Sequence, residues 1–225
     1  MIREFTFNEF WYLIQATRWT ILLAAVAFVG GGIVGLVIAL MRTAKARAPV
    51  VAAIGYIKLF QGTPLLMQLY LIYFGSNMFG LRMDPWTAAA LAFTLYASAF
   101  LGEIWRGCIQ AIPKGQWEGG RALALGYVHQ LRFIILPQAL RIATPPTVGF
   151  LVQLLKGTSL ASIIGFVELT RAAQVVNNST FRPFTVYALV AVIYFSLCWP
   201  LSRFADRLES RLGRHHMMPK VQGQV

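Results

Sequence analysis

The sequence predicts an all-α polytopic membrane protein with about five transmembrane helices and one cytoplasmic loop built from short helices. Of its 225 residues, 57% are hydrophobic and 12% are charged, about half the charge density of a soluble domain. Apolar runs of about 20 residues, enough for a helix to cross a bilayer, recur along the chain. The longest polar segment between them, 116–137, has helical stretches on either side of Gly126.

Charge, cysteine and histidine usage argue against a nucleic-acid-binding protein and against a metal site. The net charge of +12 comes from 20 Lys and Arg against 8 Asp and Glu. The basic residues flank apolar runs, as the positive-inside rule describes, and do not form one face for nucleic acid. Cys108 and Cys198 lie in or beside apolar runs and are expected to be buried thiols. His129 has no second histidine or cysteine at ligand spacing, so no metal site is expected.

The N-terminal segment is expected to stay in the mature protein. Met1–Asn8 contains Glu4 and lacks the basic region and cleavage site of a removable signal peptide. Residues 5–17 carry aromatic side chains at helical spacing, which predicts a helix lying on the membrane surface and not spanning it. We therefore expect 1–18 to be an outer interfacial segment.

Residues 19–41 form the first uninterrupted span. Gly31 and Gly35 have the GxxxG spacing that permits close helix contact, either within the chain or with another chain. The basic residues that follow are Arg42, Lys45 and Arg47. They mark a cytoplasmic loop, so the first span runs from outside to inside.

The second apolar segment, about 54–75, returns to the outside and contains polar and helix-breaking residues. Lipid penalises such groups unless they face protein or a cavity. Thr63 and Gln68 are therefore candidates for the lining of a translocation pathway. Hydrogen bonding between helices is the equally open alternative.

The third span, about 86–105, follows a short outer loop and ends at Glu103 and Arg106. These two residues are three apart on one helical face and able to pair. We interpret them as a structural pair that anchors the inner end of the helix. The alternative places Glu103 in the substrate path or at a subunit interface.

The cytoplasmic loop 114–137 predicts two short helices joined at Gly126, a glycine that can take the left-handed conformation and close the first helix. A fourth apolar segment, 137–155, must bend or restart at Pro145-Pro146, because proline lacks the backbone N–H.

A polar break follows the fourth apolar segment, at Lys156, Thr158 and Ser159. Irregular backbone at membrane depth is tolerated where it lines a cavity, so these three residues are further pathway candidates. Residues 160–166 form either a half-helix dipping into the bilayer or an outer surface helix.

The rest of the chain predicts a polar outer loop at 172–183, a last span at 184–202 and a basic cytoplasmic tail at 206–225. The transmembrane domain is then 19–205, with the N-terminus outside and the C-terminus in the cytoplasm. The chain has no G-x-x-x-x-G-K-[ST] motif and is not expected to bind ATP through a P-loop.

Four motifs together carry a family resemblance. They are 118–126 with Ile135-Leu136-Pro137, Gln61-Gly62-Thr63-Pro64-Leu65, Glu103-Ile104-Trp105-Arg106-Gly107 and Lys156-Gly157-Thr158-Ser159-Leu160. The first resembles the EAA loop of ATP-binding-cassette (ABC) importer permeases, whose consensus is roughly E-A-A, three residues, G, and a spacer ending in I-x-L-P. The others resemble that family's R-G-T-P-L, E-x-x-R-G-G and K-D-T-S-L stretches. Gln116 and Gln138-Ala139 narrow the resemblance to the polar amino-acid branch (histidine, glutamate, glutamine, arginine and opine).

The resemblance implies a type I importer permease of a bacterial inner (plasma) membrane, a binding-protein-dependent transport component without a catalytic group. It implies separate ATPase subunits that bind ATP and Mg, a second permease copy or paralogue, and a periplasmic or extracytoplasmic substrate-binding protein. A polar amino acid and membrane lipid are the remaining partners, and this chain itself is expected to bind no cofactor. The residues it assigns to ATPase coupling are Gln116, Glu118, Gly119, Gly120, Ala122 and Gly126.

Gly119 and Gly120 stand where the family carries alanine. Glycine costs about 1 kcal/mol against alanine inside a helix, so alanine at both positions is expected to stiffen the helix and to be tolerated. The alternative function is a secondary amino-acid carrier or channel subunit, which usually needs intramembrane carboxylates for ion coupling. A membrane enzyme would need a nucleophile, metal cluster or carboxylate pair at depth, and the sequence offers none.

Overall fold

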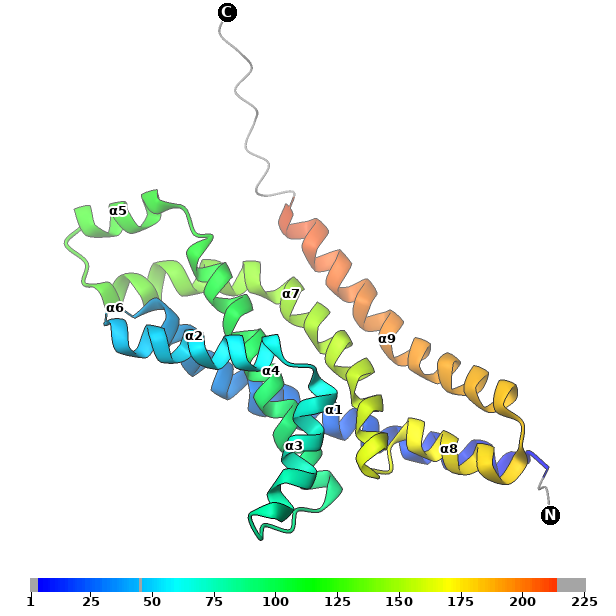
Figure 1. The fold of residues 1–225 in the computed structure, drawn as a ribbon. Helices are drawn as coiled ribbons and strands as arrows, with labels where there is room; N and C mark the ends of the chain where they lie inside the picture. Colours follow the sequence, from blue (N-terminus) through cyan, green and yellow to red (C-terminus); the bar gives the residue numbers. More distant parts are fainter. Residues whose placement is uncertain (1–3, 45, 214–225) are drawn as a thin grey trace, which may run out of the picture.

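The computed structural model describes residues 4–44 and 46–213, which form long packed helices with shorter helices at their ends (Figure 1). Among these residues, four helical stretches are long and apolar enough to cross a membrane, and a fifth span results if α2 and α3 count as one. The elements are α1 (Phe7–Thr43), α2 (Arg47–Gly62), α3 (Leu65–Met78), α4 (Pro85–Gln110), α5 (Lys114–Ala122), α6 (Tyr127–Gln130), the π-helix η1 (Leu131–Ile135), α7 (Leu136–Gly157), the 3₁₀-helix η2 (Thr158–Ile164), α8 (Leu169–Thr180) and α9 (Pro183–Gly213). The predicted all-α membrane protein with about five spans is confirmed.

α1 is one unbroken helix of 37 residues, so the prediction of a separate surface helix at 5–17 is wrong. Thr6 and Glu9 form a capping box at its start, which provides acceptors for N–H groups of the first turn. The helix is about 55 Å long at 1.5 Å per residue, longer than the roughly 30 Å hydrocarbon core. Residues 7–18 of the predicted interfacial segment 1–18 are therefore continuous with the first span, and their buried side chains Leu13 and Ala16 pack on α8 and α9.

The GxxxG spacing of α1 serves packing within the chain, against α4. A Cβ on Gly31 would lie 2.5 Å from Ala97 Cβ, and one on Gly35 would lie 3.0 Å from the Ser98 carbonyl oxygen. Real Cβ atoms do not approach other atoms as closely as the first of these distances. The two helices thus approach to a separation that only glycine permits.

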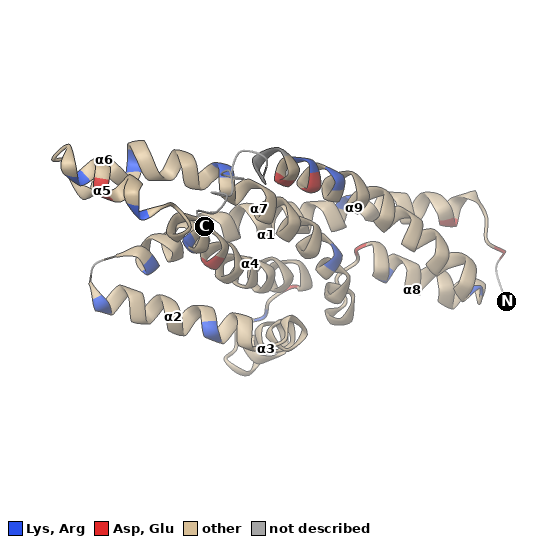
Figure 2. Cartoon of the chain, turned by 90° about the horizontal axis from the view of Figure 1, so that it is seen from above, with Lys and Arg blue, Asp and Glu red and all other residues tan. Residues whose placement is uncertain are grey.

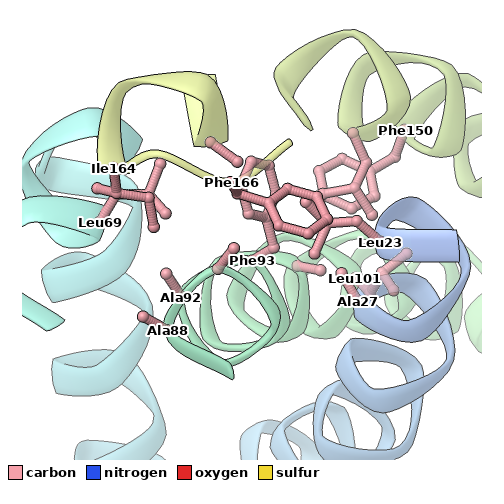
Figure 3. Packing of buried hydrophobic residues seen from close by; sticks show 14 residues of the cluster. Leu23, Ala27, Leu69, Ala88, Ala92, Phe93, Leu101, Phe150, Ile164 and Phe166 are labelled. Atoms are coloured by element: carbon pink, nitrogen blue, oxygen red, sulfur yellow. The ribbon is translucent and has the colours of Figure 1, made fainter. Parts of the chain in front are cut away.

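An apolar cluster around Phe93 joins four parts of the chain (Figure 3). Phe93 of α4 is fully buried and lies among Leu23 of α1, Phe150 of α7 and Phe166, which follows η2. Gly165, in the left-handed conformation with φ of 87°, ends η2 and turns the chain toward α8. The segment that follows the polar break after α7 is therefore packed into the apolar core and is not a free loop.

The predicted second span is two helices that meet at 99°. Thr63 between them is extended, with φ of −115° and ψ of 141°, the conformation favoured for a residue before proline. Pro64 therefore fixes the break that the polar sequence had indicated. The size of the bend could not be derived from the sequence.

The predicted cytoplasmic loop 114–137 differs from its prediction in two ways. The left-handed residue is Ala124, with φ of 54°, whereas Gly126 is extended, with φ of −64° and ψ of 154°, and precedes α6. Three residues separate Ala124 from the Glu118–Gly120 triplet, the spacing at which the family consensus places its glycine. In addition, the second short helix is no separate element, because α6, η1 and α7 are contiguous.

Three further predictions are corrected. α7 continues through Pro145 and Pro146 as one helix, which excludes a restart there, while the bend stays a prediction. Residues 169–180 form helix α8, whose apolar side packs on α1 and α9, so most of the predicted outer loop 172–183 is helical. α9 extends to Gly213, so the predicted basic tail 206–225 begins inside a helix. Lys45 and residues 214–225 lie outside the described part of the chain.

Candidate functional site

The elbow, defined here as residues 114–135, comprises α5, a turn, α6 and η1. It extends beyond the long helices at one end of the molecule (Figure 1). Ile109, Ile112 and Ile135 are buried beneath it, with Trp117 packed against them. The Trp117 ring also stacks on Tyr127, with ring centroids 5.9 Å apart and an interplanar angle of 17°. The elbow therefore has its own apolar base that joins α4, α5 and η1.

Five of the six residues predicted to contact an ATPase are exposed. Gln116, Glu118, Gly119 and Ala122 on α5 and Gly126 before α6 are open to solvent, whereas Gly120 is buried. The sequence did not single out three exposed apolar residues of the elbow, Leu123, Val128 and Phe133, which are 74%, 73% and 60% exposed. Exposed apolar groups on a polar loop are typical of contact surfaces.

Gly120 is buried because the side chain of Gln130 lies against it. A Cβ at position 120 would lie 2.8 Å from Gln130 Cγ and 2.9 Å from Gln130 Cδ. Gln130 is 3% exposed, and its Nε2 donates to the Leu125 carbonyl oxygen at 3.0 Å. The backbone N–H of Leu125 donates in turn to the Gly120 carbonyl at 3.0 Å. Gln130 therefore holds the turn between α5 and α6.

A cleft of about 690 Å³ lies between the elbow and the C-terminal ends of α1 and α4. Its charged lining residues are Arg42, Lys114, Glu118 and Arg121. Tyr127 crosses one side of it, and its hydroxyl donates to the Thr43 carbonyl oxygen at 3.2 Å. The elbow is therefore tied to the end of α1, and the cleft carries more positive than negative charge.

Glu103 and Arg106 are paired, as the sequence indicated. Arg106 Nε donates to Glu103 Oε2 at 2.9 Å, and Arg106 also contacts Gln110. Arg42 Nε at the end of α1 lies 3.8 Å from the same Glu103 oxygen. The three side chains thus link α1 to α4 beside the cleft. Lysine and arginine residues also gather at this end of the molecule (Figure 2).

The pathway candidates on α2 and α3 surround the 99° break. Gln68 is 6% exposed, and its Nε2 donates to the carbonyl oxygens of Phe60 at 2.8 Å and Thr63 at 3.1 Å. The Gln68 Nε2 group also donates to the Thr63 hydroxyl at 2.9 Å. Thr63 itself is exposed. Gln68 therefore satisfies backbone groups that the break frees, and Thr63 presents the accessible surface.

The second set of candidates lies where α7 changes into η2. Lys156 is exposed, Ser159 is partly exposed and Thr158 is fully buried, its hydroxyl donating to the Leu155 carbonyl at 2.7 Å. A Cβ on Gly157 would lie 3.7 Å from Leu65 Cδ2 of α3. The two broken segments, far apart in sequence, are therefore neighbours in space.

Known proteins similar to this chain are transport components. A family model described as binding-protein-dependent transport system inner membrane component matches residues 31–214. The L-cystine transport system permease protein TcyB of Bacillus subtilis (strain 168) is 36% identical over 215 residues, covering 91% of this chain and 92% of the relative. The glutamine transport system permease protein GlnP of Escherichia coli (strain K12) is 34% identical over 215 residues, covering 93% and 98%.

Among solved structures, the crystal structure of an amino acid ABC transporter with histidines aligns with a TM-score of 0.85 at 35% identity. The alignment covers 89% of this chain and 94% of that chain. The range matched by the family model, 31–214, includes both the elbow and the two helix breaks at 62–65 and 157–158.

Proposed function

The chain belongs to the family of binding-protein-dependent transport system inner membrane components, and from that membership we propose that it moves a polar amino acid into the cell. It has the fold of a type I ABC importer permease and is a transport component, not an enzyme. The amino-acid cargo is inferred from the relatives, which are permeases for cystine and glutamine. The observation that carries the proposal is similarity over nearly the whole chain.

The elbow is the proposed contact with a separate ATPase that binds ATP and Mg. Its support is the exposure of Gln116, Glu118 and Ala122, together with the exposed apolar side chains of Leu123 and Val128. The adjacent cleft carries Arg42, Lys114 and Arg121 beside Glu118. The ATPase surface that enters it should therefore be acidic, with a basic group opposite Glu118. The elbow rests on a buried apolar base, so a push on α5 would move α4 and η1 and not only the loop.

We place the elbow in the cytoplasm and the N-terminus outside. The support is the cluster of Lys and Arg at the elbow end of the molecule (Figure 2), which the positive-inside rule assigns to the cytoplasmic face. A substrate-binding protein would then deliver the amino acid at the opposite face. A second permease copy or a paralogue would complete the central pathway.

The pathway in this proposal runs past the two neighbouring breaks. Thr63, Lys156 and Ser159 present accessible polar groups, and Gln68 and Thr158 support the backbone from inside. An amino acid carries a carboxylate and an ammonium group, which need donors and acceptors along a mostly apolar route. Exposed hydroxyls and an ammonium side chain at helix breaks provide them.

Purification of the intact complex through a tag on this chain tests the function. We expect an ATPase to co-purify, and reconstituted vesicles to accumulate a polar amino acid only with ATP and the loaded binding protein. A secondary carrier would transport without any ATPase. Amino-acid uptake at full rate by this chain alone would therefore refute the importer proposal.

Single cysteines in a background without Cys108 and Cys198 test the pathway. A membrane-impermeant thiol reagent should label cysteine at 63, 156 and 159, at rates that change when ATP or loaded binding protein is added. Cysteine at 68 and 158 should remain slow, because both side chains are buried. Equal inertness at all five positions would show that the pathway is lined elsewhere.

A further inference from the structure

Glu168 is a buried carboxyl group that neither the elbow nor the pathway surface uses. It lies between η2 and α8 and is 0% exposed. Its Oε1 accepts the Arg171 backbone N–H at 2.8 Å, so it caps the N-terminus of α8. Burial raises the pKa of Glu168 above its usual range. A buried carboxyl without enough partners would be costly, so its hydrogen bonds decide what it does.

The second oxygen of Glu168 joins two other helices. Tyr194 of α9 donates its hydroxyl to Glu168 Oε2 at 3.0 Å, and Thr20 of α1 lies at 3.5 Å from the same oxygen. The Thr20 hydroxyl accepts the Leu169 backbone N–H at 3.1 Å, so its own hydrogen is available for Glu168. The carboxylate therefore has three donors, which come from three different helices.

The same network lies beside a pathway candidate. The Tyr194 hydroxyl also hydrogen-bonds with that of Thr170 at 3.1 Å. The Tyr194 ring packs against a buried cluster that includes Leu155 of α7, whose carbonyl oxygen accepts the Thr158 hydroxyl. Thr158 is the first residue of η2 and is fully buried. Tyr194 therefore connects Glu168 and Thr20 by hydrogen bonds to the end of α7 by packing, at the point where η2 begins.

We propose that Glu168 is a positioning residue that fixes η2, and with it the pathway surface at Ser159, against α1 and α9. The inference rests on the proposed function, because it assigns η2 to the pathway. Glu168 does not touch substrate in this proposal. It sets the geometry at the junction of α7 and η2 through Tyr194. A change that separates Glu168 from Tyr194 should therefore let η2 shift.

The threonines of α1 provide a matched pair of variants. Thr20→Val removes the hydroxyl that contacts Glu168, whereas Thr17→Val removes a hydroxyl that donates only to the Leu13 carbonyl of its own helix. Both side chains are buried, at 0% and 9% exposure. A general effect of losing a buried hydroxyl should therefore appear in both.

Glu168→Asp separates capping from positioning. Aspartate remains a good N-cap for α8 and keeps the charge, but its side chain is one methylene shorter and withdraws from Tyr194. Tyr194→Phe removes the same contact from the other side and leaves the cap intact. If Glu168 were only a cap, Glu168→Asp would behave as the wild type.

The test uses the assembled complex with its ATPase and binding protein, in a background that carries Ser159→Cys as a reporter. We expect Glu168→Asp, Tyr194→Phe and Thr20→Val to change the rate of thiol labelling at 159 about tenfold, the effect of one hydrogen bond to a charged group. The apparent KM for loaded binding protein should change with it. Thr17→Val should leave both quantities unchanged.

Unchanged labelling and KM in Glu168→Asp and Tyr194→Phe, with normal assembly, would overturn the proposal. Equal effects of Thr17→Val and Thr20→Val would do the same, because they would indicate loss of stability only. If the wild-type complex transports no amino acid, the proposed function fails instead. The labelling rates at 159 still test whether Glu168 positions η2, because they do not depend on transport. If Glu168→Asp does not assemble, Tyr194→Phe and Thr20→Val decide the question.

Discussion

Gly119 and Gly120 are adjacent on α5, yet the structure predicts opposite outcomes for alanine at the two positions. A Cβ at 119 would have no neighbour within 4 Å, so Gly119→Ala should stabilise the helix by about 1 kcal/mol through propensity alone. A Cβ at 120 would overlap the Gln130 side chain. The sequence-based expectation that both alanines are tolerated is thus supported at 119 and opposed at 120.

The free-energy cost of Gly120→Ala follows from the displacement of the Gln130 side chain. Overpacking a buried site costs about 1–3 kcal/mol, and displacing Gln130 also removes its bond to the Leu125 carbonyl, worth about 0.5–1.5 kcal/mol. The propensity gain of about 1 kcal/mol offsets part of this. We expect a net destabilisation of the elbow by about 2 kcal/mol.

Hydrogen exchange of the elbow in the purified permease measures this difference. The Leu125 amide, which bonds to the Gly120 carbonyl, should exchange about 30-fold faster in Gly120→Ala, because each 1.4 kcal/mol is a factor of ten. In Gly119→Ala it should exchange about fivefold more slowly. Gln130→Ala added to Gly120→Ala should recover most of the loss.

Slower exchange in Gly120→Ala than in the wild type would refute the reasoning. It would show that Gln130 moves aside without cost and that helix propensity alone governs the elbow. A failure of Gln130→Ala to rescue Gly120→Ala would contradict the assigned clash in a second, independent way.

Three other predictions test the packing and the proposed docking. Ala124→Gly should slow exchange in the elbow by relieving about 1 kcal/mol of left-handed strain, and faster exchange would contradict the assigned conformation. Gly31→Ala should lower the thermal stability of the permease by about 1–3 kcal/mol, while Gly32→Ala, whose Cβ would lie 3.6 Å from Trp105, should not; equal effects would disprove the close contact with α4. Glu118→Lys should reduce the amount of ATPase that co-purifies without affecting membrane insertion, and undiminished co-purification with normal transport would exclude this residue from the docking surface.

Much of the fold could be predicted because lipid imposes simple rules. Long apolar runs fixed the four clear spans, and the spacing of Glu103 and Arg106 was enough to predict their pairing. The polar residues around Pro64 correctly indicated a break. Its 99° angle depends on how α3 packs against α4 and η2, and those contacts are not local in sequence.

The missed elements had weaker or misleading signals. Residues 172–180 were predicted to belong to a polar loop, although Leu169, Ala172, Ala173 and Val176 repeat at helical spacing and are buried. The left-handed turn was predicted at Gly126 because glycine favours that conformation. In the structure Ala124 adopts it instead. Glu168 gave no signal, because a buried carboxyl in a network across three helices is visible only after folding.

The route from the elbow to the pathway is a single helical run. α6, η1, α7 and η2 extend without interruption from Tyr127 to Ile164 over 38 residues, so a displacement of the elbow is carried along the axis to Thr158. The π-turn at η1, where the Leu136 N–H bonds to the Leu131 carbonyl, is the exception to regular α-helix before that point. Such turns are rare and often lie at functional sites. Because the run ends beside Tyr194 and Glu168, which join α8, α9 and α1, a push from the ATPase would be transmitted to the residues that we assign to the pathway.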